Sequence, residues 1–405
     1  MRFLNKYYSL ILIFTSLSFL TACNETNLTQ FKIENTNSID VEFAPVSIPF
    51  VSEEFPEFFQ IIDGNENEIP YQLDDLDRDG TPEQLFLQLS IPANSYKVLS
   101  VIKVEEAPSY SSKTDITIKV RDEKDLDNMQ VSDDFNSVNK YIEEFDYKQD
   151  NGLIFLEGPG WESNLVGYRL YFDDRNRFDI FGKSTEDLSL NNISETYHER
   201  RSWGADVLKV SSSLGIGTPA LLSDGTFYTI EKTGIKSLEI ISDGPLRSIL
   251  NISYPEWEVN DQVTDVNIQL EIHANHRYTE LRLSSDLDKA TFATGLVTHP
   301  NISEIVQSKT DLYSYGYTWG DQTDLNEGLG MAVIIPNKYS PNYVGEFQET
   351  YVYSLKNQNS SISYRFLAAW ELEPENIRLN SEQEFQNYIN QVANQWQMPL
   401  KVTKE

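Results

Sequence analysis

The sequence predicts a mainly β protein with few helices, in which a small N-terminal β-sandwich precedes a large antiparallel β-sandwich. Three observations support this fold class. The chain has 405 residues, more than the roughly 100–200 residues of one typical domain. Most of it consists of short runs in which apolar and polar residues alternate between turn residues, as in antiparallel strands. Only two segments have the spacing of a helix.

We expect the small unit at residues 31–125 and the large unit at residues 126–405. Within the first, residues 85–89 and 96–102 have the alternating pattern of strands. The polar, turn-rich residues 107–113 are typical of a linker. This part of the chain therefore predicts a small sandwich of short strands.

The clearest strand of the large unit is Asp265–His273. Its Val, Ile and Leu residues fall on one face, and its Asn, Gln, Glu and His residues fall on the other. This alternation is typical of an antiparallel strand with one buried and one solvated face. The following run, residues 276–283, continues the pattern, so the large unit is expected to consist mostly of such strands.

Two segments have helical spacing. In residues 134–147, apolar and aromatic side chains recur at helical intervals. Near the C-terminus, Ser381 and Glu384 form a capping box. It opens a predicted helix whose apolar side chains, from Phe385 to Trp396, share one side.

The start of the chain predicts lipid anchoring. Residues 1–22 have a positive start and a short apolar run, as a secretory signal peptide does. The run ends in Leu-Thr-Ala-Cys, which resembles a bacterial lipobox and implies acylation of Cys23; an ordinary secretory signal is the alternative. Cys23 is the only cysteine, which excludes an intrachain disulfide. Residues 23–30 are expected to tether the protein to a lipid bilayer, at the outer membrane or cell surface.

The net charge excludes one class of partner. The chain has 32 Lys and Arg residues against 63 Asp and Glu residues, a formal charge of −31. Nucleic-acid binding depends on neutralising phosphates with Lys and Arg, so no nucleic-acid partner is expected. An anionic ligand would need a local basic pocket within this negative field.

An Asp-rich turn indicates a candidate metal site. Asp75, Asp77 and Asp79 alternate along the chain and Gly80 follows them, as in the first half of a calcium-binding loop. A complete EF-hand loop needs Glu at position 12, where this chain has Phe86. Calcium is therefore a candidate cofactor, and an Asx-rich turn between strands is the alternative.

The first candidate binding segment follows the Gly-Pro-Gly turn at residues 158–160. Trp161 can stack on the apolar face of a sugar ring, and Glu162 and Arg169 can bond its hydroxyls or a carboxylate substituent. Tyr168 is a further substrate-binding candidate and a candidate proton donor. The alternative for this segment is a core Trp beside a structural ion pair.

A second candidate segment gathers polar and aromatic residues. His198 lies beside Tyr197, Arg200, Arg201 and Trp203, which is the best local anion site in an acidic chain. A histidine here suits general acid–base chemistry near neutral pH, and the arginines suit a uronate carboxylate. The alternative is a surface loop of weak ion pairs.

Two further residues are candidates by position. His299 lies between Gly295 and Pro300, at a strand end or loop, where sites often occur. Trp319 and Asp321 repeat the pairing of an aromatic ring with an acid. The sequence has no zincin, P-loop or nucleophile-elbow motif.

Several stretches resemble a known family. WESNLVGYRLYFDDRNRFDIFGKS, RRSWGADVLKVSSSLGIG and ATGLVTHPN are similar to a bacterial lipoprotein family defined by a domain of unknown function, family 4861. SDGPLRSILNISY and RYTELRLSSDL also resemble the β-supersandwich of galactose-mutarotase-like proteins and polysaccharide lyases. The resemblance implies use of acidic, pectin-like polysaccharides at the cell envelope. It supplies no residue-by-residue mechanism.

From the residues together with this resemblance, we favour an enzyme, and among enzymes a lyase that acts on uronate-containing oligosaccharides or polysaccharides, because the clustering of histidine, arginine and tyrosine exceeds what sugar stacking requires. Arg200 and Arg201 would neutralise the uronate carboxylate, and charge stabilisation of the intermediate would dominate. His198 or His299 would be the base, and Tyr197 or the tyrosine of the first segment would be the acid.

Three alternatives remain open. A glycoside hydrolase would need two carboxylates beside the scissile bond, for which Glu162 and Asp206 are candidates. A non-catalytic glycan-binding lipoprotein would need only aromatic platforms. A sugar epimerase is the third.

Overall fold

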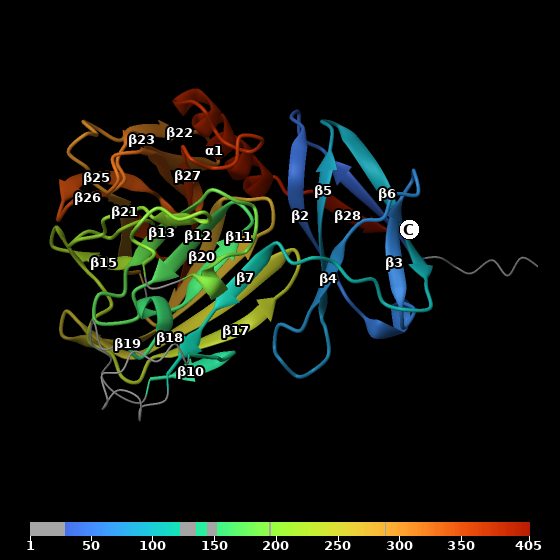
Figure 1. Cartoon of the computed structure of the whole chain (residues 1–405), viewed down its shortest axis with the longest axis horizontal. Helices are drawn as coiled ribbons and strands as arrows, with labels where there is room; N and C mark the ends of the chain where they lie inside the picture. Colours follow the sequence, from blue (N-terminus) through green and yellow to red (C-terminus); the bar gives the residue numbers. More distant parts are fainter. Residues whose placement is uncertain (1–28, 122–134, 144–151, 194–195, 288) are drawn as a thin grey trace, which may run out of the picture.

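The computed structural model describes residues 29–121, 135–143, 152–193, 196–287 and 289–405. These residues form two β units that lie side by side (Figure 1). Strands dominate both units, and the single α-helix lies near the C-terminus of the described chain. The predicted class, a mainly β protein with few helices, is confirmed.

The small unit is a sandwich of two sheets around one apolar core, to which Ile33, Leu87 and Leu99 contribute. Its four-stranded sheet has the order β28 (Lys401–Lys404), β1 (Gln30–Asn35), β6 (Ser95–Lys103) and β3 (Phe59–Asp63). Its three-stranded sheet has the order β2 (Val41–Pro49), β5 (Gln84–Ile91) and β4 (Tyr71–Asp74). The strands predicted at 85–89 and 96–102 are confirmed as parts of β5 and β6.

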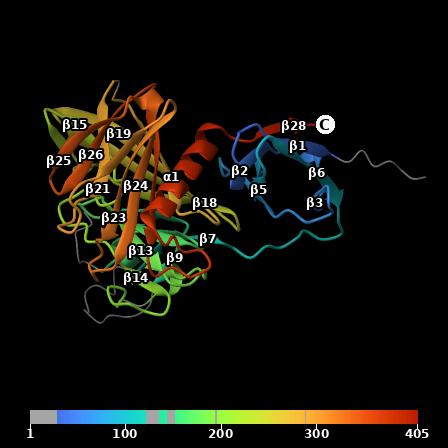
Figure 2. The same cartoon turned by 90° about the horizontal axis from the view of Figure 1, so that it is seen from above.

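Strand pairing divides the chain differently from the expected division at residue 125. The C-terminal strand β28 returns to the small unit and pairs with β1, as Figure 2 shows for the red end of the chain. Strand β7 (Thr114–Thr117) already pairs with a strand of the large unit. The first passage between the units therefore lies between β6 and β7, over the stretch that contains the predicted linker.

The large unit is built on a nine-stranded antiparallel sheet. Its order is β10 (Lys140–Ile142), β17 (Ser237–Asp243), β18 (Arg247–Val259), β19 (Gln262–His273), β20 (Tyr278–Ser285), β27 (Ser361–Trp370), β24 (Gly328–Pro336), β23 (Tyr313–Asp321) and β22 (Val306–Lys309). The strand predicted at 265–273 is confirmed as part of β19.

Two five-stranded sheets cover one face of the nine-stranded sheet. The first has the order β14 (Gly204–Asp206), β13 (Phe178–Lys183), β12 (Val166–Leu170), β11 (Gly160–Ser163) and β7. The second has the order β16 (Thr226–Tyr228), β15 (Ala220–Ser223), β21 (Thr291–Val297), β26 (Thr350–Lys356) and β25 (Asn342–Phe347). Side chains from all three sheets share one apolar core, which contains Trp161, Leu270 and Phe366.

Several short elements complete the described chain. A two-stranded sheet joins β8 (Lys119–Val120) and β9 (Asn136–Ser137). Short 3₁₀ turns occur at η1 (Ser52–Glu54), η3 (Phe155–Glu157), η4 (Leu190–Asn192) and η5 (Asn337–Tyr339). No helix among the described residues is long and apolar enough to cross a membrane.

The opposite face of the nine-stranded sheet has two different halves. Helix α1 (Glu382–Gln397) covers the half built from β23, β24 and β27, where tyrosines and aliphatic residues pack on Phe385, Ile389 and Val392. The other half, built from β18, β19, β20 and part of β27, carries polar side chains and lies beside the small unit. The face is therefore divided into an apolar docking surface for α1 and an open polar surface.

The two helical predictions have opposite outcomes. Helix α1 begins where the capping box predicts, because the Ser381 hydroxyl accepts a hydrogen bond from the Glu384 amide at 3.2 Å. The predicted helix at 134–147 is wrong in its described part, which forms β9 and β10. Residue 134 and residues 144–147 lie outside the described residues. Tertiary pairing of β10 with β17 overrides the helical spacing of this segment.

Candidate functional site

A cleft of about 470 Å³ lies between the small unit and the open polar surface of the nine-stranded sheet. Strands β2 and β5 of the small unit form one wall, where Val46, Gln84 and Phe86 line the cleft. Its floor carries charged side chains from neighbouring strands of the sheet. They are Arg247, Glu271, His273, Glu280, Arg282 and Arg365.

Strand register brings these side chains together. Glu271 of β19 lies directly opposite Glu280 of β20, and Glu280 lies opposite Arg365 of β27. One step along the sheet, Arg247 of β18 lies opposite His273. Side chains directly opposite each other on one face are about 4.5–5.5 Å apart at Cβ. The floor of the cleft is therefore a compact block of paired charges.

Arg282 bridges the two facing carboxylates. Its Nη1 lies 3.1 Å from Glu271 Oε2, and its Nη2 lies 2.7 Å from Glu280 Oε1. Two opposed carboxylates repel each other, and a guanidinium between them offsets this repulsion. The Arg282 side chain is 48% exposed, whereas the carboxylates are almost buried. Arg282 is thus the cation that a ligand in the cleft would meet.

The other two arginines of the block are buried. Arg365 Nη2 lies 2.8 Å from Glu280 Oε2, with its guanidinium over the rings of Tyr278 and Trp396. Arg247 donates from Nε and Nη2 to Asp74 Oδ2 of the small unit, at 2.8 and 2.6 Å. This bidentate pair joins the two units across the cleft.

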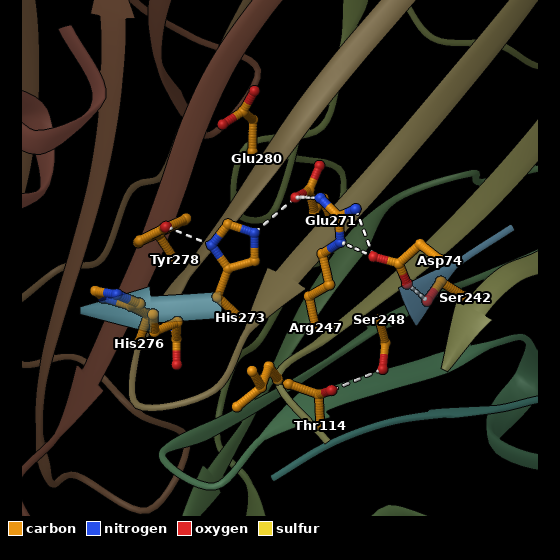
Figure 3. A network of polar contacts seen from close by, with 12 residues as sticks. Asp74, Thr114, Ser242, Arg247, Ser248, Glu271, His273, His276, Tyr278 and Glu280 are labelled. Atoms are coloured by element: carbon orange, nitrogen blue, oxygen red, sulfur yellow. Dashed lines mark hydrogen bonds and ion pairs between the residues drawn. The ribbon is translucent and has the colours of Figure 1, made fainter. Parts of the chain in front are cut away.

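His273 is held in one tautomer by its partners (Figure 3). Its Nε2 lies 2.6 Å from Glu271 Oε1, and its Nδ1 lies 2.6 Å from the Tyr278 hydroxyl. An ionised carboxylate only accepts, so Nε2 carries the proton and Nδ1 accepts from Tyr278. Burial lowers the pKa of His273, against the opposing effect of Glu271, and this favours the neutral ring.

Glu271 is stabilised as a carboxylate. Burial acts to raise its pKa, but His273 and the two arginines beside it together hold that pKa well below its ordinary value. The site therefore combines an ionised carboxylate with a neutral imidazole and a tyrosine hydroxyl that donates toward the imidazole. Such a chain fixes the orientation of each group.

The open polar surface continues beyond the cleft as a second groove of about 390 Å³. Gln269 and Arg282 line both spaces. Besides Glu239 at one end of the strand set, the groove carries uncharged hydrogen-bonding side chains from successive strands. They are Ser237, Asn251, Ser253, Asn267, Ser284 and Ser361. A row of amides and hydroxyls beside a charged cleft suits an extended ligand that is rich in hydroxyl groups.

The first sequence-predicted segment lies in the core, which corrects its expected role. Trp161 is 1% exposed, and its indole donates to the Thr279 hydroxyl at 2.8 Å. Tyr168 and Arg169 are fully buried. An indole enclosed between two sheets has no face for a sugar ring, so these three side chains do not form a substrate surface.

Glu162 is likewise structural in this fold. Its carboxylate pairs with buried Lys183 and accepts from the amides of Ser189 and Leu190 at 2.7 and 2.6 Å. Glu162 is 1% exposed. Its expected catalytic role is therefore corrected, because every partner of this carboxylate is protein and the group does not face solvent.

The second predicted segment forms an exposed loop above a buried ion cluster. His198 is 65% exposed, and its Nδ1 lies 3.0 Å from Asp206 Oδ2. The hydrogen bond that the protonated His198 ring donates to the Asp206 carboxylate raises the pKa of His198. Behind this dyad, Arg169 Nη2 lies 2.7 Å from both Asp206 and Asp179, and Arg169 Nη1 donates to the Tyr197 hydroxyl at 3.1 Å.

The remaining residues of that loop are paired with local partners. Arg200 pairs with Glu327, and Arg201 pairs with Glu199 at 2.7 Å. Trp203 packs on Phe181 with ring centroids 6.0 Å apart. Their predicted binding roles stay predictions.

His299 and Trp319 lie elsewhere. His299 lines a separate groove of about 660 Å³ with Thr298 and Glu349. Trp319 packs against Phe385 of α1, with ring centroids 5.3 Å apart. The structure therefore does not join Trp161, His198 and His299 in one cleft. The catalytic role of His299 and the binding role of Trp319 stay predictions.

The Asp-rich turn gathers four carboxylates. One oxygen from each of Asp75, Asp77, Asp79 and Glu83 lies within 4.8 Å of the others. Backbone amides already donate to several of them, for example Gly80 to Asp75 at 2.8 Å. Oxygen ligands at this spacing fit a hard cation such as Ca²⁺, with Glu83 as a member that the sequence pattern did not indicate. Calcium binding stays a prediction, as does acylation of Cys23, which lies outside the described residues.

The charged floor of the cleft was missed as a site from the sequence, although its signal was visible. The polar face of the strand at 265–273 contains Glu271 and His273, and the next strand contains Glu280 and Arg282. Alternation alone assigns such a face to solvent. Only the position of the small unit turns this face into the floor of a cleft.

Comparisons with known proteins gave two kinds of match. A protein in the glycosyl hydrolase family 38 from Enterococcus faecalis has a TM-score of 0.41 and 7% identity, over 94% of this chain and 48% of that chain. An alpha-mannosidase from the same organism has a TM-score of 0.42 and 8% identity, over 94% of this chain and 46% of that chain. This chain thus spans about half the length of each, and likeness at this level identifies no activity. A search of curated proteins found no match.

The match to a family model is more extensive. It covers residues 33–402, which include both β units, the cleft between them and α1. The chain therefore belongs to the family described as "Domain of unknown function (DUF4861)".

Proposed function

We propose that this protein is a carbohydrate-active enzyme whose site is the cleft between the two units, and that it cleaves uronate-containing, pectin-like polysaccharides by elimination. The observation that carries the proposal is the half-exposed Arg282 between the facing carboxylates of Glu271 and Glu280. The hydroxyl- and amide-lined groove that continues from Arg282 supports an oligosaccharide ligand.

In this proposal Arg282 exchanges partners when substrate binds. A uronate carboxylate forms a charge-assisted pair with the guanidinium. The guanidinium then gives up its ion pairs with Glu271 and Glu280. The two freed carboxylates then face each other without their shared cation, and this raises the pKa of one of them. One carboxylate stays ionised and acts as the base, and the other takes up a proton from solvent and acts as the acid.

The elimination uses both groups. The ionised carboxylate removes the proton at C5 of the uronate, which Arg282 has made more acidic by neutralising the adjacent carboxylate. The C4–O bond breaks, a C4–C5 double bond forms, and the leaving oxygen takes the proton of the second carboxyl group. Tyr278 and His273 keep Glu271 oriented throughout, since His273 bonds one of its oxygens.

The proposed location is the cell envelope, with the protein held by acyl chains on Cys23. The support is the signal-like start and the Leu-Thr-Ala-Cys sequence. The net charge of −31 makes the local guanidinium more important for an acidic ligand, because the global field repels anions.

The test is incubation of the detergent-solubilised full-length chain with oligogalacturonate, rhamnogalacturonan, ulvan and alginate oligosaccharides. Ultraviolet absorbance and product masses are followed, with and without calcium. New absorbance together with shorter products is expected for at least one acidic glycan, and Arg282→Ala abolishes it. Arg201→Ala, at a half-exposed and ion-paired arginine outside the cleft, is the matched control.

Each other outcome points to a different function. Products that have gained water without absorbance mean a glycoside hydrolase, for which the facing Glu271 and Glu280 supply two carboxylates. A change of sugar configuration without chain shortening means an epimerase. Binding without any product means a glycan-binding lipoprotein. Loss of turnover in Arg201→Ala but not in Arg282→Ala moves the site to the loop of His198.

A further inference from the structure

A further pocket, distinct from the cleft and from both grooves described above, lies on the other side of the junction between the small and the large unit. Its volume is about 560 Å³, and it is walled by β2 of the small unit, the turn between β19 and β20, and the start of α1. Three elements that are distant in sequence therefore build it. It shares no lining residue with the cleft of Arg282.

One wall of this pocket is an aromatic ring on strained backbone. Phe43 has a φ of 48°, in the left-handed region that bulky residues rarely adopt. It lies in a β-bulge, where the register of β2 on β5 shifts between Val41 and Ala44. Bulges often change the direction of side chains near functional sites. Phe43 is 45% exposed at this bulge.

The strained backbone is held from both sides. The Phe43 amide donates to the Ser90 hydroxyl at 3.0 Å. The Phe43 carbonyl accepts from His276 Nε2 at 2.9 Å, and burial of that ring favours its neutral form. Strain that the surroundings maintain is a reason to expect function at the strained residue. The result is an aromatic face fixed at the mouth of the pocket.

The charge of the pocket selects against acids. Glu42, Glu186 and Glu384 line it, and Arg277 is its only basic lining residue. Arg277 is buried and paired with Glu373, at 3.0 Å from Nε to Oε1. A ligand carboxylate would therefore meet negative side chains and no free guanidinium in this pocket.

The remaining lining groups offer hydrogen bonds. Asn387 and Gln391 lie on the exposed side of α1, and Asn376 lies in the loop before it. The Tyr388 hydroxyl accepts from the Arg277 amide at 2.8 Å, which leaves its own proton free to donate. Amides, a hydroxyl and carboxylates beside one aromatic face match a ring that has hydroxyls on its edge and an apolar face.

We infer that this pocket binds a neutral pyranose sugar, stacked on Phe43 and hydrogen-bonded by the polar groups of α1. It is a glycan-binding site separate from the cleft, and it does not rest on the function proposed for the cleft. The two sites differ in charge, so the protein would hold a neutral sugar at one site and an acidic sugar at the other.

The test is a direct binding measurement on the detergent-solubilised full-length chain. Cellobiose, mannobiose and galactobiose are the neutral probes and digalacturonate is the acidic probe, followed by saturation-transfer NMR and calorimetry. At least one neutral disaccharide is expected to bind, and Phe43→Ala and Asn387→Ala are each expected to weaken its binding by tenfold or more. Phe58→Ala, at another exposed aromatic residue of the small unit, is the matched control.

Three results would overturn the inference. They are no binding of any neutral disaccharide, equal affinity in the Phe43→Ala and Phe58→Ala variants, and weakening of digalacturonate but not of the neutral sugar by Phe43→Ala. Because neutral-sugar binding is measured without turnover, its failure is distinguishable from a failure of the elimination proposed for the cleft.

Discussion

Two arginines of this protein have the same kind of partners and opposite surroundings. Arg169 binds two carboxylates, Asp179 on the neighbouring strand and Asp206 on the next, and is fully buried. Arg282 also binds two carboxylates, Glu271 on the neighbouring strand and Glu280 on its own, but its side chain is 48% exposed. The first lies within the layered large unit, and the second lies at the floor of a cleft.

An arginine–carboxylate cluster is therefore not in itself evidence of a functional site. Around Arg169 the tyrosine hydroxyls and the carboxylates are partners of one another within the protein. Burial and the nearby Asp206 raise the pKa of Asp179 to about 7, and Arg169 opposes this rise. Around Arg282 the carboxylates have a partner that a ligand can reach and replace. Access to solvent, and not the composition of the cluster, separates a structural network from a candidate site.

The largest expected effect is on stability, at the buried cluster. Arg169→Ala leaves Asp179 and Asp206 buried without their shared cation, so the free energy of unfolding should fall by about 3–5 kcal/mol. Denaturant unfolding measures this. Arg282→Ala should cost less than this, because Glu271 keeps Arg247 and Glu280 keeps Arg365 as ion-pair partners. Equal losses of unfolding free energy in the two variants would show that exposure does not distinguish the two clusters.

The next effect is on turnover, at the exposed cluster. Arg282→Ala should lower kcat/KM for an acidic oligosaccharide by about 100-fold, because it removes the cation that stabilises developing charge. Arg282→Lys should recover only part of this, since an ammonium cannot bond a carboxylate through a planar fork. Steady-state kinetics on the folded variants decides the matter, and an unchanged kcat/KM in Arg282→Ala would rule out the proposed role.

A smaller effect is expected on the pH dependence of stability, through His276, which contacts the small unit. Burial lowers the pKa of His276 to about 3. The folded pKa lies below the unfolded value near 6.5, so the unfolded chain takes up the proton first. The contribution of His276 to stability is thus complete above about pH 6.5 and is lost as the pH falls, by about 2 kcal/mol at pH 5.

Thermal unfolding between pH 7.5 and 5 tests this effect. His276→Gln keeps a donor for the Phe43 carbonyl but does not titrate, so it should flatten the pH dependence of Tm. His299→Gln, at a histidine in a separate groove, serves as the reference. If Tm depends on pH as steeply in His276→Gln as in the unmodified protein, titration of His276 is not the cause of the pH dependence.

The smallest effect concerns the Asp-rich turn at the edge of the small unit. If its four carboxylates hold calcium, a concentration of about ten times Kd should add about 1.4 kcal/mol to stability. Calorimetric scans with calcium and with a chelator measure this. Asp77→Asn should remove the response, whereas equal scans with and without calcium in the unmodified protein would exclude the site.

Much of the fold follows from local pattern. The strand at 265–273, the capping box at Ser381 and the predominance of β-structure are visible as alternation and spacing, because both depend on near neighbours in the chain. The segment at 134–147 shows the limit of this reasoning. Its helical spacing gives way to strand pairing with β17, which joins residues about a hundred positions apart.

The candidate site depends on information of another kind. Arg169, in the run Val-Gly-Tyr-Arg-Leu, and Arg282, in the run Leu-Arg-Leu, both alternate with apolar residues, so the sequence gives them the same appearance. Local pattern was enough to predict the β class, the strand at 265–273, the helix that starts after Ser381, the acidic charge and the signal-like start. Which polar face meets solvent follows only from the three-dimensional packing, because it depends on the sheet or unit that lies against that face. This packing placed Arg169 beneath a loop and Arg282 at the floor of a cleft.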